Sequence, residues 1–291
     1  MLGKKSYRVI PHVPVLLDGA WGTEFQKRGL APGRSPELWN LERPETVEEV
    51  ASAYIEAGSE IILTNTFGGN AIALMRHGVG DRVREINRAG AELSRRAAGA
   101  RARVFGCMGP TGALLAAREI SPAAAECAFA EQADVLAESS VDGIVIETMT
   151  DLEEALAALR AARRTGLPIA VTMVFDSGPS GLHTVMGVGV AEAARKLADE
   201  GADIVGMNCG VGIAEAVRVT LAFRTAVSLP VWVKPNAGLP VLRDGEIVYP
   251  STAEEFASHA RSLVEAGASY IGGCCGTTPA YITALKKTFT R

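Results

Sequence analysis

Short apolar runs rich in β-branched residues alternate with alanine-rich amphipathic stretches along the whole chain. In stretches such as 44–58, 151–166 and 251–267, apolar residues recur every three or four positions, which predicts helices. Asp151 and Ser251 stand where their N-caps are expected. The other runs are almost continuously apolar and predict eight strands, at 13–20, 60–67, 103–110, 142–149, 168–175, 203–210, 230–238 and 269–276.

Near-continuous apolar strands that alternate with helices are typical of a parallel sheet covered on both faces. Eight such units in 291 residues predict the α/β class and one closed (β/α)₈ TIM barrel, with residues 1–291 as a single domain. Two stacked smaller α/β domains are the alternative. Residues 239–249, with Asp244-Gly245 as a two-residue turn, predict a small hairpin inserted after strand seven. Residues 176–189 predict a mobile loop after strand five.

Composition and charge narrow the possible functions. A net charge of −4 argues against a surface for nucleic acid or anionic membrane, so neither is expected as a partner. No stretch approaches the roughly 20 apolar residues of a membrane span, and the first residues lack the features of a signal peptide. Five cysteines, an odd number without framework spacing, favour free thiols in a reducing compartment. We therefore expect a cytoplasmic protein.

Polar residues interrupt the apolar strands, always at the same end. Because barrels of this kind carry their chemistry at the carboxyl ends of the strands, this regularity is the main functional signal of the sequence. The residues at these ends are Asp18, Asn65, Thr66, Glu147, Cys209, Asn236, Cys274 and Cys275.

The three strand-end cysteines predict a metal site. Cys209 ends strand six, and Cys274 and Cys275 end strand eight among glycines that let the backbone leave regular strand geometry. Three converging thiolates need a cation, and zinc suits sulfur ligands while leaving a fourth position open. The alternatives are three buried small hydrophobic residues or a redox-active vicinal pair. Cys107, Cys127 and the four histidines lack ligand spacing and are expected not to bind metal.

Two carboxylates, Asp18 and Glu147, follow strongly apolar runs. They are interpreted either as structural groups, paired with a buried cation or capping a helix, or as a pair of anions that receives a substrate ammonium group. Lys234 stands beside a proline on strand seven, a place that favours a structural role over a Schiff base.

Taken in order, several motifs resemble the homocysteine S-methyltransferase family and, within it, the homocysteine-binding barrel of cobalamin-dependent methionine synthase. They are "LLDGAWGTEFQKRG", "ILTNTFGGN", "VIETMTD", "GMNCG", "KPNAG" and "IGGCCGTTP", and the likeness covers roughly residues 12 to 288. The resemblance implies a zinc-dependent enzyme that transfers a methyl group to the thiol of homocysteine, forming methionine. No general base on the protein is required by this chemistry.

The resemblance also implies roles for individual residues. The zinc ligands of the family match Cys209, Cys274 and Cys275, and Asn236 matches a residue that takes the fourth zinc position when substrate is absent. Recognition of the ammonium and carboxylate of homocysteine is expected at Asp18, Gly19, Ala20, Asn65, Thr66 and Glu147.

The sequence indicates the methyl donor less clearly than it indicates the metal and the acceptor. Betaine-using relatives carry an aromatic residue where this chain has Gly68, followed by Gly69, so the sequence favours the cobalamin-linked branch. Because the chain contains a single barrel, a separate methyl-corrinoid protein is the expected donor, with methylcobalamin carried on it. The alternatives are S-methylmethionine or betaine as donor, or a non-catalytic zinc- or thiol-binding barrel. A lyase or sugar-phosphate isomerase is disfavoured, because the eighth loop has no glycine-rich phosphate site.

Overall fold

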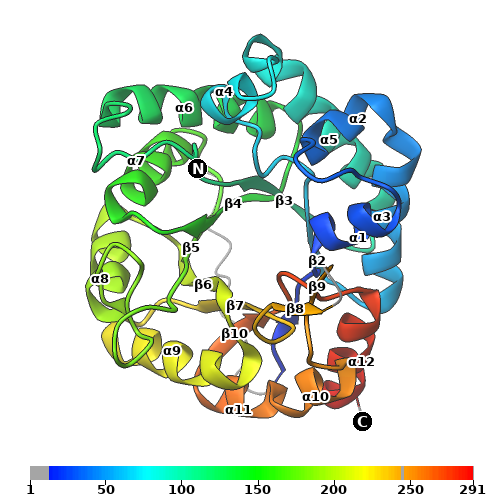
Figure 1. Cartoon of the computed structure of the whole chain (residues 1–291), viewed down its shortest axis with the longest axis vertical. Helices are drawn as coiled ribbons and strands as arrows, with labels where there is room; N and C mark the ends of the chain where they lie inside the picture. Colours follow the sequence, from blue (N-terminus) through cyan, green and yellow to red (C-terminus); the bar gives the residue numbers. More distant parts are fainter. Residues whose placement is uncertain (1–12, 244–245, 291) are drawn as a thin grey trace.

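The computed structural model describes residues 13–243 and 246–290. Eight parallel strands form one sheet in the order β1-β10-β7-β6-β5-β4-β3-β2, and a parallel bridge between Leu17 and Ile61 joins its two edges. The result is a nearly closed barrel ringed by helices (Figure 1). Its strands are β1 Val15–Leu16, β2 Ile61–Leu63, β3 Arg103–Met108, β4 Gly143–Met149, β5 Ile169–Met173, β6 Ile204–Gly212, β7 Val231–Asn236 and β10 Ala268–Ile271.

The predicted (β/α)₈ barrel is therefore confirmed. The alternative of two stacked smaller domains is wrong, because the eight strands share one sheet. The assignment of residues 1–291 to a single domain stays a prediction.

The longer helices follow the strands and surround the sheet (Figure 1). They are α3 Pro44–Ala57, α5 Val83–Ala98, α6 Pro122–Glu138, α7 Leu152–Arg163, α8 Val190–Glu200, α9 Ile213–Ala226 and α12 Pro279–Phe289. The shorter ones are α1 Trp21–Lys27, α2 Trp39–Glu42, α4 Ala71–Met75, α10 Ala253–Ser258 and α11 Ala260–Glu265, with single 3₁₀ turns at Pro36–Leu38 and Gly80–Arg82. Among the described residues, no helix is both long and apolar enough to cross a membrane.

Local sequence signals explain where several helices begin and end. Helix α3 ends at Gly58, whose φ of +116° is left-handed and therefore suits glycine. The side chain of Asp151 caps α7 by accepting from the backbone N–H of Glu153, as predicted. The predicted N-cap at Ser251 is wrong. Thr252 caps α10 instead, because its hydroxyl and the carboxylate of Glu255 form a reciprocal capping box.

The region predicted as one helix at 251–267 is two helices, α10 and α11, that meet at His259. The periodicity of apolar residues continues across this point, which is why the pattern alone indicated a single helix.

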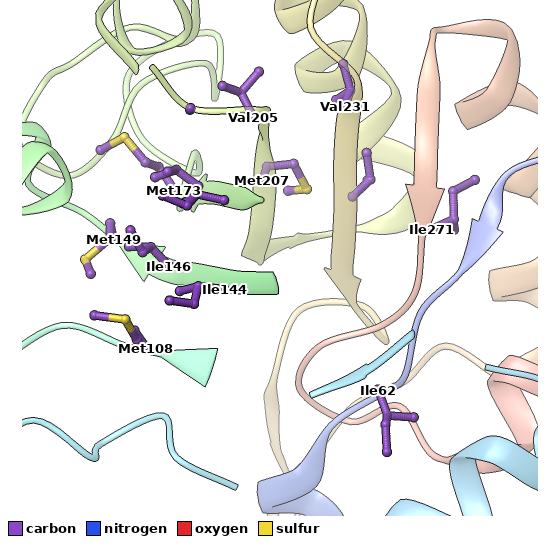
Figure 2. Close-up of a cluster of buried hydrophobic side chains, with 14 of the residues drawn as sticks. Ile62, Met108, Ile144, Ile146, Met149, Met173, Val205, Met207, Val231 and Ile271 are labelled. Carbon is purple, nitrogen blue, oxygen red and sulfur yellow. The ribbon is translucent and has the colours of Figure 1, made fainter. Parts of the chain in front are cut away.

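Buried side chains lie in two layers, one on each side of the sheet. Figure 2 shows part of the outer layer, where residues such as Ile62, Met108 and Ile271 lie between strands and helices. The inner layer fills the barrel, and Trp232 at its centre contacts Phe105 and Tyr270 with ring centroids 5.9 Å and 5.3 Å away. These side chains fill the interior of the barrel, so a site for chemistry is expected at the carboxyl ends of the strands.

Two connections on that face match their predictions in outline. Strands β8 Val241–Arg243 and β9 Glu246–Val248 pair antiparallel, which confirms the hairpin after strand seven, while its Asp244-Gly245 turn lies outside the described residues. The connection 176–189 holds two isolated bridges, both made by His183, to Ser177 and Gly189. The mobility of this loop stays a prediction.

Candidate metal centre

The three strand-end cysteines converge on one point. The sulfur atoms of Cys209, Cys274 and Cys275 all lie within 4.8 Å of one another, and the Sγ atoms of Cys209 and Cys275 are 3.5 Å apart. Cys209 comes from β6, and the adjacent pair follows β10. Because β7 lies between these two strands in the sheet, the cluster spans three neighbouring strands.

Departures from strand geometry bring the sulfur atoms together. Cys209 has a φ of +61° and Gly210 a φ of +71°, both left-handed, where the pairing of β6 with β7 shifts register. A left-handed conformation at a non-glycine residue costs on the order of 1–3 kcal/mol and persists only where its surroundings hold it. On the other side, the backbone N–H of Cys274 donates to the carbonyl of Pro235 at 2.8 Å, which fixes the pair against β7.

This arrangement fits a zinc ion. Zinc–sulfur bonds of about 2.3 Å in a tetrahedron place sulfur atoms about 3.8 Å apart, close to the observed separations. Asn236, the predicted fourth ligand, is buried, and its Oδ1 has no hydrogen-bond partner among the described residues. It lies beside the cysteine pair, since the next residue, Ala237, donates its N–H to the carbonyl of Cys275 at 2.9 Å. A buried acceptor without a donor is a suitable oxygen ligand.

The electrostatics of the cysteine cluster also favour a bound cation. The hydrogen bond to Cys274, reinforced by burial, raises the pKa of Cys209 to about 12. The contact with Cys209, again with burial, raises the pKa of Cys275 to about 11. The crowded thiols thus resist ionisation by themselves, and a bound metal ion is what would stabilise them as thiolates.

A pocket of about 270 Å³ opens directly over the cluster. All three cysteines line it, so a fourth ligand can approach the metal position from the pocket. Of the predicted substrate residues, Gly19, Ala20, Asn65 and Glu147 also line it. Residues not singled out from the sequence complete its wall, among them Trp21, Glu37 and Phe67.

Asp18 lies just behind the pocket wall, where it forms a buried ion pair. Its Oδ1 is 2.6 Å from the ammonium nitrogen of Lys234, and the two side chains are 0% and 3% exposed. Its Oδ2 accepts from the backbone N–H of Leu63 and from the indole N–H of Trp21. Burial acts to lower the pKa of Lys234, but the negative charges of Asp18 and Glu147 outweigh it and hold that pKa above its usual value. Asp18 is therefore paired with a buried cation, which was one of the two interpretations of this residue from the sequence.

Glu147 differs from Asp18, because Glu147 lines the pocket and Asp18 does not. Its Oε1 accepts a hydrogen bond from the thiol of Cys107 at 3.2 Å, and burial raises the pKa of the Glu147 carboxyl group. Cys107 had no recognisable partner in the sequence. The register of β3 against β4 supplies it by placing Cys107 beside Val145 on the inner face of the barrel.

Asn65 and Thr66 have different positions in the wall. Asn65 faces the pocket, while its amide nitrogen donates to the carbonyl of Pro36 and to the side chain of Asn40. Thr66 is fully buried behind the wall, where its hydroxyl donates to the carbonyl of Cys107 at 2.7 Å. The structure thus places Thr66 outside the pocket lining, in a position to shape the loop that carries Asn65.

Comparison with known proteins extends over nearly the whole chain. The model of the family described as homocysteine S-methyltransferase matches residues 15–289. The chain is 34% identical over 287 residues to methionine synthase of Mycobacterium tuberculosis, which covers 91% of this chain and 24% of that protein. It is 28% identical over 293 residues to betaine–homocysteine S-methyltransferase 1 of Bos taurus, covering 93% and 71% of the two chains. This chain thus spans about a quarter of the length of the methionine synthases it matches.

Among solved structures, the metallated form of the homocysteine methyltransferase MmuM from Escherichia coli is similar over almost its full length. The TM-score is 0.80 at 25% sequence identity, with 94% of this chain and 96% of that chain covered. The matched region contains the barrel, the cysteine cluster and the pocket above it. The chain therefore belongs to the homocysteine S-methyltransferase family.

Proposed function

We propose that this chain binds zinc through Cys209, Cys274 and Cys275 and transfers a methyl group to the thiol of homocysteine, forming methionine. The observation that carries this proposal is that the three sulfur atoms converge at the base of a pocket that also presents a carboxylate. When bound, zinc acts as a Lewis acid that makes a thiol with an ordinary pKa of about 8.5 ionise at neutral pH. Asn236 would complete the ligand set before substrate enters.

Within the pocket, the charges indicate how the amino acid would be oriented. The charge of Asp18 is already matched by Lys234, whereas the Glu147 carboxylate has, within residues 13–243 and 246–290, a thiol as its one direct hydrogen-bond partner. We therefore assign the substrate ammonium to Glu147. Asp18 would act from behind by holding Lys234 and Trp21 in place.

The remaining predicted residues would complete the substrate site. Gly19, Ala20 and Asn65 would provide polar contacts from the wall, with Thr66 supporting the Asn65 loop.

We further propose that the methyl donor is a methyl-corrinoid protein that docks in trans. The likeness to methionine synthase supports a donor of this class. Gly68 argues against an aromatic cage for betaine, because a Cβ atom there would lie 3.1 Å from a carboxylate oxygen of Glu37, which accepts the N–H of Gly68 at 2.7 Å. A large side chain at this position would have to displace that buried carboxylate.

The hairpin after β7 offers a surface for such a partner. Leu242 and Ile247 on its two strands are 77% and 68% exposed, and Leu239 beside them is exposed as well. Figure 1 shows β8 and β9 within the ring of helices, on the connection that leaves the carboxyl end of β7. Apolar side chains in this position would be covered by a docked protein but not by a small donor.

A donor screen tests the proposal. Zinc-loaded protein is incubated with homocysteine and, in separate reactions, a methyl-corrinoid protein, S-methylmethionine or betaine, and methionine is measured. We expect turnover with the methyl-corrinoid protein. Turnover with S-methylmethionine or betaine alone would overturn the donor assignment, and homocysteine binding without turnover under any condition would support the non-catalytic alternative.

Variants of the hairpin sharpen the screen. Leu242→Asp combined with Ile247→Asp should reduce turnover with the methyl-corrinoid protein and leave turnover with free methylcobalamin unchanged. Leu221→Asp, at another exposed leucine on α9, is the matched control and should change neither rate. Equal loss with both donors would mean that the hairpin does not dock the partner.

A further inference from the structure

Asn208, the residue before Cys209, is fully buried and uses its whole side chain in hydrogen bonds. Its Oδ1 accepts from the backbone N–H of Thr148 and from the hydroxyl of Thr172, both at 2.7 Å. Its Nδ2 donates to the hydroxyl of Thr148 at 2.6 Å and contacts the sulfur of Cys274 at 3.8 Å. One carboxamide on β6 thus connects the ends of β4 and β5 with the cysteine pair beyond β10.

The contact with Thr148 holds an unfavourable backbone conformation. Thr148 has a φ of +64°, which is a rare value for a β-branched residue. Two hydrogen bonds with Asn208 fix this residue in place: the backbone N–H of Thr148 donates to Oδ1 of Asn208, and Nδ2 of Asn208 donates to the Thr148 hydroxyl. The pairing of β4 with β5 shifts register between Ile146 and Met149, so the chain leaves regular geometry here.

This local shape determines where Glu147 points. Glu147 directly precedes Thr148 within the irregular part of β4, and both residues line the pocket. If Thr148 relaxed to an ordinary negative φ, the peptide that joins the two residues would rotate and the Glu147 side chain would move with it.

The other end of the carboxamide reaches the candidate metal ligands. Its N–H group faces the sulfur of Cys274, at a separation that the large radius of sulfur allows for a weak hydrogen bond. Such a donor stabilises a thiolate and restricts its orientation. Because Asn208 is also the residue before Cys209, which has a left-handed φ, both segments that carry the sulfur atoms are held by one side chain.

We propose that Asn208 is a positioning residue that joins the metal ligands to the substrate carboxylate. It orients Cys274 at one end and, by holding Thr148 left-handed, orients Glu147 at the other. The half that concerns Glu147 rests on the proposed function, since it takes homocysteine as the ligand. The half that concerns Cys274 depends only on metal binding.

The experiment uses Asn208→Ala, the double variant Asn208→Ala/Thr148→Gly, and Thr172→Val as a matched control. Glycine adopts a positive φ without the hydrogen bonds that Asn208 makes to Thr148. The double variant should therefore recover the Glu147 orientation but not the contact with Cys274. Thr172→Val removes one buried hydrogen bond to Asn208 and leaves the other contacts intact. Zinc affinity is measured by chelator competition. Homocysteine affinity is measured from the absorption spectrum of the cobalt-substituted protein, which requires no turnover.

We expect Asn208→Ala to weaken zinc binding by about 10- to 100-fold, as is usual when an outer partner of a metal ligand is lost. We expect a weakening of homocysteine binding by a similar factor, and Thr148→Gly should restore the homocysteine affinity to within roughly threefold of the wild type without restoring the zinc affinity. Thr172→Val should lower thermal stability and leave both affinities unchanged. The proposal would be overturned if Asn208→Ala left both affinities unchanged, or if Thr172→Val weakened them as much as Asn208→Ala does. It would also be overturned if the double variant did not recover homocysteine affinity selectively.

A second variant covers the case in which Asn208→Ala fails to fold. Asn208→Asp keeps the acceptor oxygen but replaces the N–H group that faces Cys274, so the sulfur-to-cobalt charge-transfer band should shift. An unchanged band would overturn the contact with Cys274. Wild-type protein that binds cobalt but not homocysteine would contradict the proposed function and leave the result for Cys274 intact.

Discussion

Replacing Lys234 should show how much its buried ion pair with Asp18 contributes to the free energy of unfolding. In Lys234→Met, the carboxylate of Asp18 stays 0% exposed but loses the cation that lies 2.6 Å away. Breaking a buried pair on one side costs about 3–5 kcal/mol, because the remaining charge is left without compensation. The N–H groups of Leu63 and Trp21 still donate to Asp18, so we expect the lower half of this range. In a chain of this size, that corresponds to a decrease of about 5–7 °C in Tm.

A double-mutant cycle separates the pair from its surroundings. Asp18→Asn should be about as costly as Lys234→Met, whereas the double variant should cost far less than the sum, with a coupling free energy of roughly 2–3 kcal/mol. Some loss should remain in the double variant, because an asparagine whose oxygen accepts from both Leu63 and Trp21 turns its NH₂ group toward residue 234, where the methionine thioether is only a weak acceptor.

The assay is urea unfolding followed by circular dichroism and tryptophan fluorescence, with coincident transitions as the condition for a two-state analysis. Arg34→Met is the control, since it breaks the exposed pair with Glu42 and should not measurably change the free energy of unfolding. Additive effects of the two variants in the cycle would refute the reasoning. Homocysteine binding by the double variant then decides whether Asp18 also contacts the substrate.

Three further predictions concern the metal and the barrel interior. Cys209→Ser should lose zinc and activity together, measured as the zinc-to-protein ratio and the rate of methionine formation, while Cys127→Ser, at an exposed thiol, should lose neither. Because the pKa of Cys209 is raised to about 12, protons must leave before metal binds. Zinc affinity should therefore fall as pH falls from 8 to 6, by up to ~1000-fold per pH unit for three thiols, and a flat profile in chelator competition would contradict this. Gly206→Ala should destabilise the protein by about 3 kcal/mol or more in urea unfolding, since the new Cβ would lie 1.8 Å from the carbonyl oxygen of Trp232, whereas Gly22→Ala meets no atom within 4 Å and should be tolerated.

The sequence was sufficient to predict the barrel and the cysteine cluster, because both depend on patterns that repeat. Each strand is marked by its own apolar run, and parallel strands necessarily bring their carboxyl ends to one face. That rule places Cys209, Cys274 and Cys275 on the same face, although Cys209 and Cys275 are 66 positions apart along the chain. The hairpin was predictable for a similar reason, since its two strands and its turn are local in sequence.

Partners of individual side chains were not predictable in the same way. Asp18 and Lys234 are 216 residues apart, and their pairing depends on how the segment after β1 is aligned with β7, on the other side of β10. The donation from Cys107 to Glu147 likewise depends on strand register. Asn208 had a visible signal, as a carboxamide within an apolar strand next to a candidate ligand, but nothing in the sequence indicated that it would contact Thr148.

The position of the β8–β9 hairpin has a consequence for how such proteins diverge. The hairpin lies between β7 and α10 in the chain and forms a two-stranded sheet of its own, separate from the eight-stranded sheet. The three sulfur atoms are held instead by β6 and by the segment after β10. The tips of β8 and β9 can therefore change without moving the three cysteines, whereas Tyr249, which directly follows β9 and hydrogen-bonds to Cys275, connects the end of the hairpin to the cluster. If the hairpin docks the methyl donor as proposed, replacing its exposed residues would change which donor is accepted and leave the cysteine cluster as it is.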